Sequence, residues 1–274
     1  MVQVKPFVLE NWVRQFKGAI AANFIVLDTL LGPGGHVICQ YPTYQQLYEV
    51  PRRAGADVSL CNPNKPTGAT IPQATLESLV SFAAERNIII FSDEQYKNII
   101  AVSNLSKAYA LPGIRIGWAI SPNPALMEQI TLARDYTTLS VSQIDQDIAT
   151  FTLGLGIQDG PLDRSWNICK TNLASLGKFI GSYPDRLHWM KPTGASMAFV
   201  RILDAQTGLP LDDGSYCEGL LKETGLLLVP GGKTFGTEGD DDFKGYIRLG
   251  FAVAREKFER ALKIWGEYLD RSEV

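Results

Sequence analysis

The sequence predicts an α/β domain with a mainly parallel sheet, followed by a smaller α+β domain. In the first part of the chain, short apolar segments of the buried-strand type alternate with helical stretches, as in sheets with crossover helices. After Pro184 the pattern changes to short strands with helices between them. We therefore expect a large domain at 15–160, a small domain at 161–274 and an N-terminal remnant at 1–14.

The large domain begins with a predicted helix. Residues 18–31 are rich in helix formers with apolar positions at helical spacing, and the turn residues Gly-Pro-Gly-Gly at 32–35 end the helix. A strand at 36–39, a helix at 45–55 and a strand at 56–60 are expected next. This alternation is the basis of the α/β assignment.

The segment 61–68 (CNPNKPTG) contains two prolines, two asparagines and a glycine, and it is predicted to be a loop. The elements expected after it in the large domain are a helix at 71–86, strands at 87–92, 99–102 and 114–120, and a long helical stretch from 122 through 152. In the small domain we expect helices at 166–182, 212–224 and 254–269 and strands at 186–190, 197–201, 226–229 and 246–251.

The overall composition excludes several classes of function. The 274 residues carry a net charge of -3 without a basic cluster, which argues against nucleic acid as a partner. The four cysteines are widely spaced and there are two histidines, which argues against a zinc site or a disulfide framework. No apolar run has the length of a signal peptide or a membrane span, so we expect a cytoplasmic protein without a membrane partner.

Three polar segments lie beside predicted strands, and each contains a residue type with a chemical use. They are SDEQY with Asp93, SNLSK with Lys107 and LPGIRIGW with Arg115. Ligands of open parallel sheets bind beyond the carboxyl ends of the strands, so an acid, a lysine and an arginine are expected to converge there. A lysine amine forms a Schiff base with an aldehyde, a carboxylate keeps a pyridinium nitrogen protonated, and an arginine binds a phosphate through bidentate hydrogen bonds. Taken singly, Lys107 also fits a solvated surface lysine, Asp93 a helix cap and Arg115 a structural ion pair.

Together these segments resemble signatures of the class I/II aminotransferases, pyridoxal-phosphate (PLP) enzymes of fold type I. SDEQY, SNLSKAYALPGIRIGW and NPNKPTG match the family in spacing and in content. Further similar segments are GAI at 18–20, YPTYQQL at 41–47, LLLVPGG at 226–232 and YIRLGFA at 246–252. The resemblance implies the aspartate-aminotransferase-like fold, PLP as cofactor and no metal. The YPTYQQL and GAIAAN segments are most similar to the capreomycidine-synthase branch.

The resemblance implies roles for four residues around the cofactor ring. Lys107 would be the Schiff-base lysine and would shuttle a proton between the substrate Cα and the cofactor C4′. Asp93 would face the pyridine nitrogen, and Tyr96 would hydrogen-bond the phenolic oxygen. Tyr44 would stack on the ring, although an ordinary core tyrosine is an alternative interpretation.

The resemblance also implies groups that bind anions. Arg115 would hold the cofactor phosphate with the backbone N–H groups of Ala19 and Ile20 at a helix N-terminus. Asn104 occupies a position where the family often has a hydroxyl residue that touches the phosphate. Arg248 would bind the substrate α-carboxylate.

The chain departs from the family in one motif and in length. Lys65 occupies the position of an asparagine that hydrogen-bonds the phenolic oxygen, and Asn64 would partly replace that asparagine. Relatives are longer, and the differences fall in three places. They lie before residue 18, between 60 and 62, where relatives insert a helix and another strand, and between Asp93 and Lys107, where the intervening element is mostly missing. Either a mispredicted or alternatively spliced product or a reduced descendant explains this shortening.

Three functions follow from the resemblance. The first is an aminotransferase that moves the amino group of an amino acid to a 2-oxo acid through a Lys107 aldimine, with a homodimer as the expected assembly. The second is a PLP-dependent lyase or cyclase of the capreomycidine-synthase type, which would use the same residues but break a different bond. The third is a shortened, non-catalytic protein that keeps the PLP fold.

Overall fold

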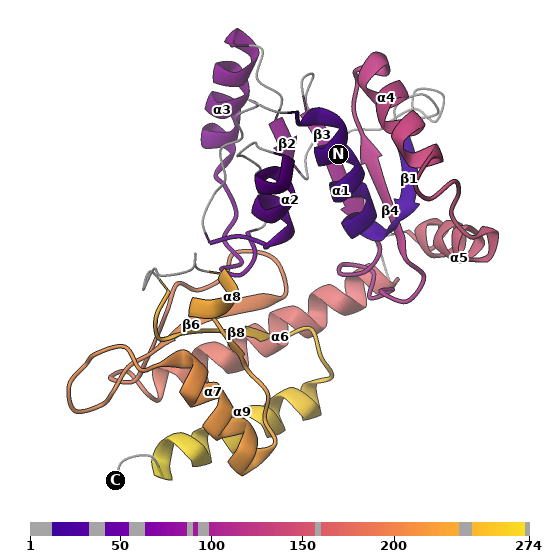
Figure 1. Cartoon of the computed structure of the whole chain (residues 1–274). Coiled ribbons are helices and arrows are strands. Elements are labelled where there is room, and N and C mark those ends of the chain that lie inside the picture. Colours follow the sequence, from indigo (N-terminus) through magenta and orange to yellow (C-terminus); the bar gives the residue numbers. More distant parts are fainter. Residues whose placement is uncertain are drawn as a thin grey trace. The chain divides into compact units, whose positions relative to one another are not determined.

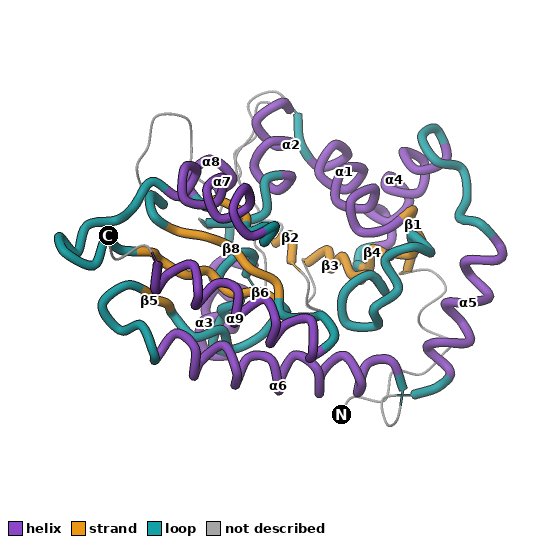
Figure 2. The backbone as a smooth tube through the Cα atoms, turned by 90° about the horizontal axis from the view of Figure 1, so that it is seen from below, coloured by secondary structure: helices purple, strands orange, loops and turns teal. Residues whose placement is uncertain are grey.

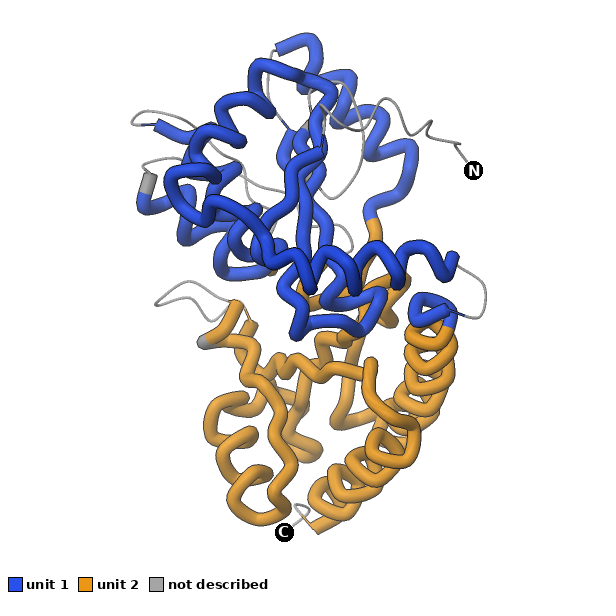
Figure 3. The backbone as a smooth tube through the Cα atoms, turned by 90° about the vertical axis from the view of Figure 1, so that its right-hand side faces the viewer, with its two compact units in different colours: residues 1–40, 44–62, 71–163 blue, residues 41–43, 63–70, 164–274 orange. Residues whose placement is uncertain are grey.

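A computed structural model describes residues 13–32, 42–54, 64–86, 90–92, 99–156, 160–235 and 243–271 of the chain. The chain divides into two compact units (Figure 3). The first unit comprises residues 1–40, 44–62 and 71–163, and the second comprises 41–43, 63–70 and 164–274. The division thus falls close to residue 160, and two short segments from the first half of the chain belong to the second unit.

The described elements of each unit follow one another along the chain (Figure 1). Those of the first unit are β1 (Val13–Lys17), α1 (Gly18–Leu30), α2 (Gln46–Ala54), α3 (Gln73–Glu85), β2 (Ile90–Ser92), β3 (Ile99–Asn104), β4 (Ile116–Ile120), α4 (Pro124–Asp135) and α5 (Gln143–Gly154). The chain then continues with α6 (Pro161–Gly181), β5 (Leu187–Trp189), β6 (Met197–Ile202), α7 (Asp213–Thr224), β7 (Val229–Pro230), α8 (Gly232–Phe235), β8 (Tyr246–Gly250) and α9 (Arg255–Arg271).

The sheet of the first unit has the strand order β1-β4-β3-β2. Strands β2 and β3 are parallel, whereas β4 is antiparallel to both of its neighbours, β1 and β3. Strands β1, β2 and β3 therefore share one direction, as the prediction of a mainly parallel sheet requires, and β4 runs against them. The reason is that residues 105–115 join β3 to β4 without a helix, and a connection of that kind returns the chain beside the strand it has just left.

One prediction in this unit is wrong, and two fall outside the described residues. The helical stretch expected from 122 through 152 is two helices, α4 and α5. The side chains of Asn123 and Ser142 cap their first turns by accepting hydrogen bonds from Leu126 N and Asp145 N. Ser142 is thus the N-cap of a second helix, and the apolar periodicity, which continues through this point, did not indicate the break. The strands expected at 36–39 and 56–60 lie outside the described residues.

Helix α1 lies in the centre of the first hydrophobic core. It contacts β3, β4, α2 and α4 (Figure 1). Its buried side chains in this core are Ala22, Ile25, Val26 and Leu27. The facing side chains come from β1, β3, β4, α2 and α4. A smaller cluster on the other face of β4 contains Leu105, Ile116, Val141 and Ala149. Strand β4 is therefore covered on both faces, as is usual for the sheets of α/β proteins.

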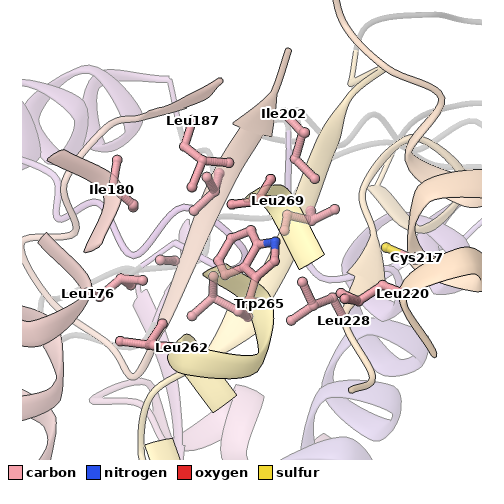
Figure 4. Close-up of a cluster of buried hydrophobic side chains, with 14 of the residues drawn as sticks. Leu176, Ile180, Leu187, Ile202, Cys217, Leu220, Leu228, Leu262, Trp265 and Leu269 are labelled. Carbon is pink, nitrogen blue, oxygen red and sulfur yellow. The ribbon is translucent and has the colours of Figure 1, made fainter. Parts of the chain in front are cut away.

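The second unit is an antiparallel sheet covered by helices, as predicted for an α+β domain. The strand order is β5-β6-β8-β7, and every pair is antiparallel. Figure 2 shows β5, β6 and β8 of this sheet among helices α6, α7 and α9. Alternate side chains of β6 and β8 enter a core with α6, α7 and α9, and Trp265 of α9 lies at the centre of that core (Figure 4). The Trp265 indole N–H donates to Tyr216 Oη over 2.8 Å, so this buried polar atom has a partner.

Among the described residues, Cys169 and Cys217 are free thiols. Burial raises the pKa of the Cys217 thiol to about 12, and the nearby negative charge of Asp213 adds to this shift. Within the described part of the chain, no group of three or more metal-ligating side chains occurs. The helices described there are too short or too polar to cross a bilayer.

We expect Tyr216→Phe to lower the free energy of unfolding by about 1–3 kcal/mol, because the buried indole N–H of Trp265 would lose its acceptor. Urea denaturation followed by tryptophan fluorescence measures this change. Tyr136→Phe is the matched control, since Tyr136 is 85% exposed and the same substitution there should cost less than about 0.5 kcal/mol. Equal effects of the two substitutions would contradict a stabilising role for this hydrogen bond.

Candidate active site

Three chain junctions meet at one edge of the first unit's sheet. Strand β1 ends at Lys17, β3 ends at Asn104 and β4 begins at Ile116. Lys17 pairs with Ile116, and Asn104 pairs with Gly117. Arg115 precedes a strand instead of following one, yet it reaches the carboxyl edge because β4 is antiparallel. The loop that carries Lys107, the residue Arg115 and the start of α1 are therefore neighbours at this edge.

The guanidinium of Arg115 lies directly over Gly18, the first residue of α1. A Cβ atom added to Gly18 would overlap the guanidinium and would lie 2.9 Å from its Cζ. Gly18 also has a φ of +78°, which glycine adopts at little cost. Arg115 itself has a φ of +49°, and its Nη1 donates to Pro112 O over 3.0 Å. The arginine is thus held over the helix start by its own backbone and by its own loop.

Gly117 allows the start of α1 to lie against β4. A Cβ atom at Gly117 would lie 2.6 Å from Gly18 C and 2.7 Å from Ala19 N, which no real side chain tolerates. The N-cap residue of α1, Lys17, provides no side-chain hydrogen bond to the first turn. A helix N-terminus without a side-chain cap and with a guanidinium beside it is suited to binding an anion.

Lys107 projects from the loop between β3 and β4, and its side chain is exposed. Hydrogen bonds fix the loop on both sides of it: Ser106 N donates to Asn104 Oδ1 over 2.8 Å, and Ala110 N donates to Lys107 O over 3.0 Å. The buried side chain of Leu105 anchors the loop in the smaller cluster. The loop therefore presents a lysine amine from a defined backbone at the edge where Arg115 lies.

The other predicted residues of the first unit differ in their surroundings. Ala19 and Tyr44 pack partly buried against the main core, whereas Ile20 is exposed in the first turn of α1. The side-chain oxygen of Asn104 is used within the Lys107 loop. Asp93 and Tyr96 lie outside the described residues, although β2 ends at the same edge one residue before Asp93.

Asn64 belongs to the second unit and is buried. Its Nδ2 donates to Pro42 O over 2.8 Å, and its Oδ1 accepts from Thr67 N over 3.3 Å and from Thr67 Oγ1 over 2.8 Å. The amide thus shapes the loop that carries Lys65, whose peptide bond to Pro66 is cis. The side-chain hydrogen bonds of Asn64 therefore stabilise this loop.

Arg248 also lies in the second unit, on the face of the sheet away from the Trp265 core. It stands opposite Phe199 of β6 and Val229 of β7. Phe199 stacks on Tyr246 with ring centroids 4.7 Å apart, so aromatic rings border the arginine on its own face. Partial burial lowers the pKa of Arg248, and no acidic side chain forms an ion pair with it within the described residues. This half-buried cation is suited to a planar anion such as a carboxylate.

The sequence placed Gly18 in a segment that resembles the phosphate-receiving helix start, but it gave neither Gly18 nor Gly117 an individual role. Each is a glycine because another group occupies the space of its Cβ. A glycine directly after a strand and at the first position of a helix is the signal that could have identified Gly18.

The chain is similar in sequence to a known family of aminotransferases. The profile of the family Aminotransferase class I and II matches residues 58–264. Aromatic-amino-acid aminotransferase 2 of Thermococcus litoralis is 28% identical over 225 residues, covering 73% of this chain and 54% of the relative. Capreomycidine synthase of Streptomyces vinaceus is 26% identical over 224 residues, covering 76% of this chain and 54% of the relative. The chain thus spans about half the length of these curated relatives.

Solved structures with the same fold cover nearly the whole chain. A PLP-dependent aminotransferase from Streptococcus suis is 33% identical, with a TM-score of 0.84 over 98% of this chain and 79% of that one. The PLP-dependent cyclase OrfR is 22% identical, with a TM-score of 0.83 over 96% of this chain and 78% of that one, which shows a shared fold. The family match over most of the chain and the likeness to these structures show that this chain belongs to the class I and II aminotransferases, with their PLP-dependent transferase fold.

Proposed function

We propose that this protein is a PLP-dependent aminotransferase that transfers the amino group of an amino acid to a 2-oxo acid. The observation that carries the proposal is the contact of Arg115 with Gly18 at the start of α1, on the sheet edge from which the Lys107 loop projects. This arrangement provides a phosphate-binding group and an amine on one rigid frame. When bound, PLP supplies a carbonyl that condenses with amines and a ring that accepts electrons.

The first-unit residues fit the phosphate end of this cofactor. Arg115 would bind the phosphate through its guanidinium, and the first-turn amides of Ala19 and Ile20 would donate to it. Asn104 would contribute through its remaining N–H groups. The overlap of a Cβ at Gly18 with the guanidinium supports this role, because a glycine there leaves the space that the guanidinium occupies beside the helix start.

Lys107 would move the proton of the reaction. Its Nζ would take the proton from the substrate Cα, and a lysine can do so because its amine accepts and returns a proton at one atom. Asp93, Tyr96 and Tyr44 would hold and orient the ring, and Asn64 would support the loop that carries Lys65. Arg248 would bind the substrate carboxylate, for which its partial burial and its lack of an ion pair among the described residues are suitable.

Mapping the modified lysine tests the proposal. We expect the protein mixed with PLP to show a visible absorption band, and borohydride reduction to place the pyridoxyl label on Lys107. Lys107→Arg should abolish both the label and amino-group transfer, whereas Lys191→Arg, at an exposed lysine, should leave both unchanged. Label spread over surface lysines would contradict the enzyme proposal and would support a non-catalytic protein.

A lyase or cyclase is the second candidate, favoured by the similarity to capreomycidine synthase and to the cyclase OrfR. Both candidates use the same residues and differ in the bond that breaks. Accumulation of pyridoxamine phosphate after addition of an amino acid alone would identify the aminotransferase. Release of an eliminated group without pyridoxamine phosphate would identify the lyase or cyclase.

Gly18→Ala tests the phosphate role. The new Cβ would occupy the place of the Arg115 guanidinium, so we expect the affinity for PLP to fall at least about tenfold, measured by absorbance titration. The affinity for pyridoxal, which lacks the phosphate, should change little. Gly113→Ala, in the loop that carries Arg115, is the control, because nothing lies within 4 Å of a Cβ there. An equal loss for PLP and pyridoxal would refute the phosphate assignment.

We also propose that the chain acts as a homodimer, with α5 in the interface. Four apolar residues lie at helical spacing on one side of this helix, and they are exposed by 72%, 39%, 70% and 47%: Ile144, Ile148, Phe151 and Leu155. Ala149 and Thr152 are buried on another side, so the stripe is not the face that α5 uses within its own unit. A second copy would cover such a stripe in a symmetric interface.

Phe151→Glu combined with Ile144→Glu should shift the protein from dimer to monomer, because the new charges would be buried in the interface. Light scattering coupled to size-exclusion chromatography measures the mass. Thr150→Glu on a different side of α5 is the control and should leave the dimer intact. A dimer that survives the double substitution would exclude this helix face from the interface.

A further inference from the structure

Strand β8 is held at both ends by buried polar side chains that come from two different helices. Arg248 lies midway, three residues after Gly245 and three residues before Phe251. Asp213 of α7 binds the backbone at Gly245, and Asn172 of α6 binds the backbone at Phe251. Neither side chain is among the site residues that the sequence predicts.

The carboxylate of Asp213 joins the beginning of β8 to the turn after β7. Its Oδ1 accepts from Gly245 N over 3.1 Å, and its Oδ2 accepts from Gly232 N over 2.9 Å. Asp213 is 5% exposed. A Cβ at Gly232 would lie 3.1 Å from Oδ1, and Gly245, with a φ of +79°, would meet Pro210 Cβ at 2.8 Å. The carboxylate therefore fixes two backbone segments that have little room to move.

The amide of Asn172 performs the same task at the other end of β8. Its Nδ2 donates to Phe251 O over 2.9 Å and to Val253 O over 2.8 Å, which uses both of its hydrogens. Asn172 is fully buried, and its Oδ1 has no hydrogen-bond partner in the described structure. The two donated bonds alone therefore set its orientation, and they hold the chain where it leaves the sheet.

These contacts bear on Arg248 because the direction of a strand side chain follows from the position of the backbone. Ile247 and Leu249, on either side of Arg248, point into the Trp265 core. A small displacement of β8 at either end would move the guanidinium while leaving the core pairs in register. A bidentate contact between an arginine and a carboxylate tolerates little displacement of the guanidinium.

We propose that Asp213 and Asn172 are positioning residues that fix the Arg248 guanidinium for a carboxylate ligand. The inference rests on the proposed role of Arg248. It adds that affinity for the carboxylate depends on two helix side chains that do not touch the ligand, and that they act on binding more than on the chemical step.

The experiment measures binding of 3-phenylpropanoate, a simple monocarboxylate, to the PLP-loaded protein by calorimetry. Asp213→Asn should weaken binding about tenfold, because an amide can no longer accept from both Gly232 N and Gly245 N. Asn172→Leu should also weaken it about tenfold, because both donors are lost. With an amino acid substrate, KM should rise by a similar factor while kcat changes less than about threefold. Each variant tests the inference by itself if the other does not fold.

Asp212→Ala is the matched control. Asp212 precedes Asp213 and caps the same helix by accepting from Ser215 N over 2.7 Å. This variant should lose stability and keep its carboxylate affinity. If the Asp213 and Asn172 variants lose stability and also keep their affinity, the two residues are structural only and the inference is wrong. If Arg248→Lys leaves carboxylate binding unchanged, or the parent protein does not bind the carboxylate, the role of Arg248 fails and the inference fails with it.

Discussion

Strand β4 runs against its neighbours, and the arrangement of the candidate active site depends on this direction. Because β4 returns beside β3 without a helix, its first residues lie at the edge where β1 and β3 end. Arg115, one residue before β4, thereby lies over Gly18. A parallel β4 would place Arg115 at the opposite edge, far from α1 and from the Lys107 loop. Gly117 completes the arrangement, since it allows the start of α1 to touch the strand.

Arg115 of the first unit and Arg248 of the second have no ion pair among the described residues, and the two are fixed by different means. Arg115 is held by its own left-handed backbone and by a bond to Pro112 O. Arg248 is held by the register of β8, whose ends are bound by buried side chains of α6 and α7. A cation without an acidic partner attracts an anion, and these two suit a phosphate and a carboxylate, the two anionic groups that an aminotransferase binds.

Local patterns predicted the elements well where capping signals and periodicity agreed. The helix expected at 18–31 is α1, and the helices and strands of the second unit lie close to their predicted positions. The stretch from 122 to 152 was read as continuous because its apolar residues persist through the break, although Ser142 starts a new helix. The segments 41–43 and 63–70 join the second unit through contacts such as Thr193 N with Gly68 O, which no local pattern encodes.

By itself, the sequence determined the order and type of most elements, the aminotransferase family and the motifs that contain Lys107, Arg115 and Arg248, because these depend on neighbouring residues and on spacing. The tertiary structure alone decided that β4 is antiparallel, that Gly18 and Gly117 touch across about one hundred residues of chain, and that Asp213 and Asn172 hold the strand of Arg248. The physical reason is that these features arise from contacts between residues far apart in the chain. Such contacts form only when the sheets and helices pack together.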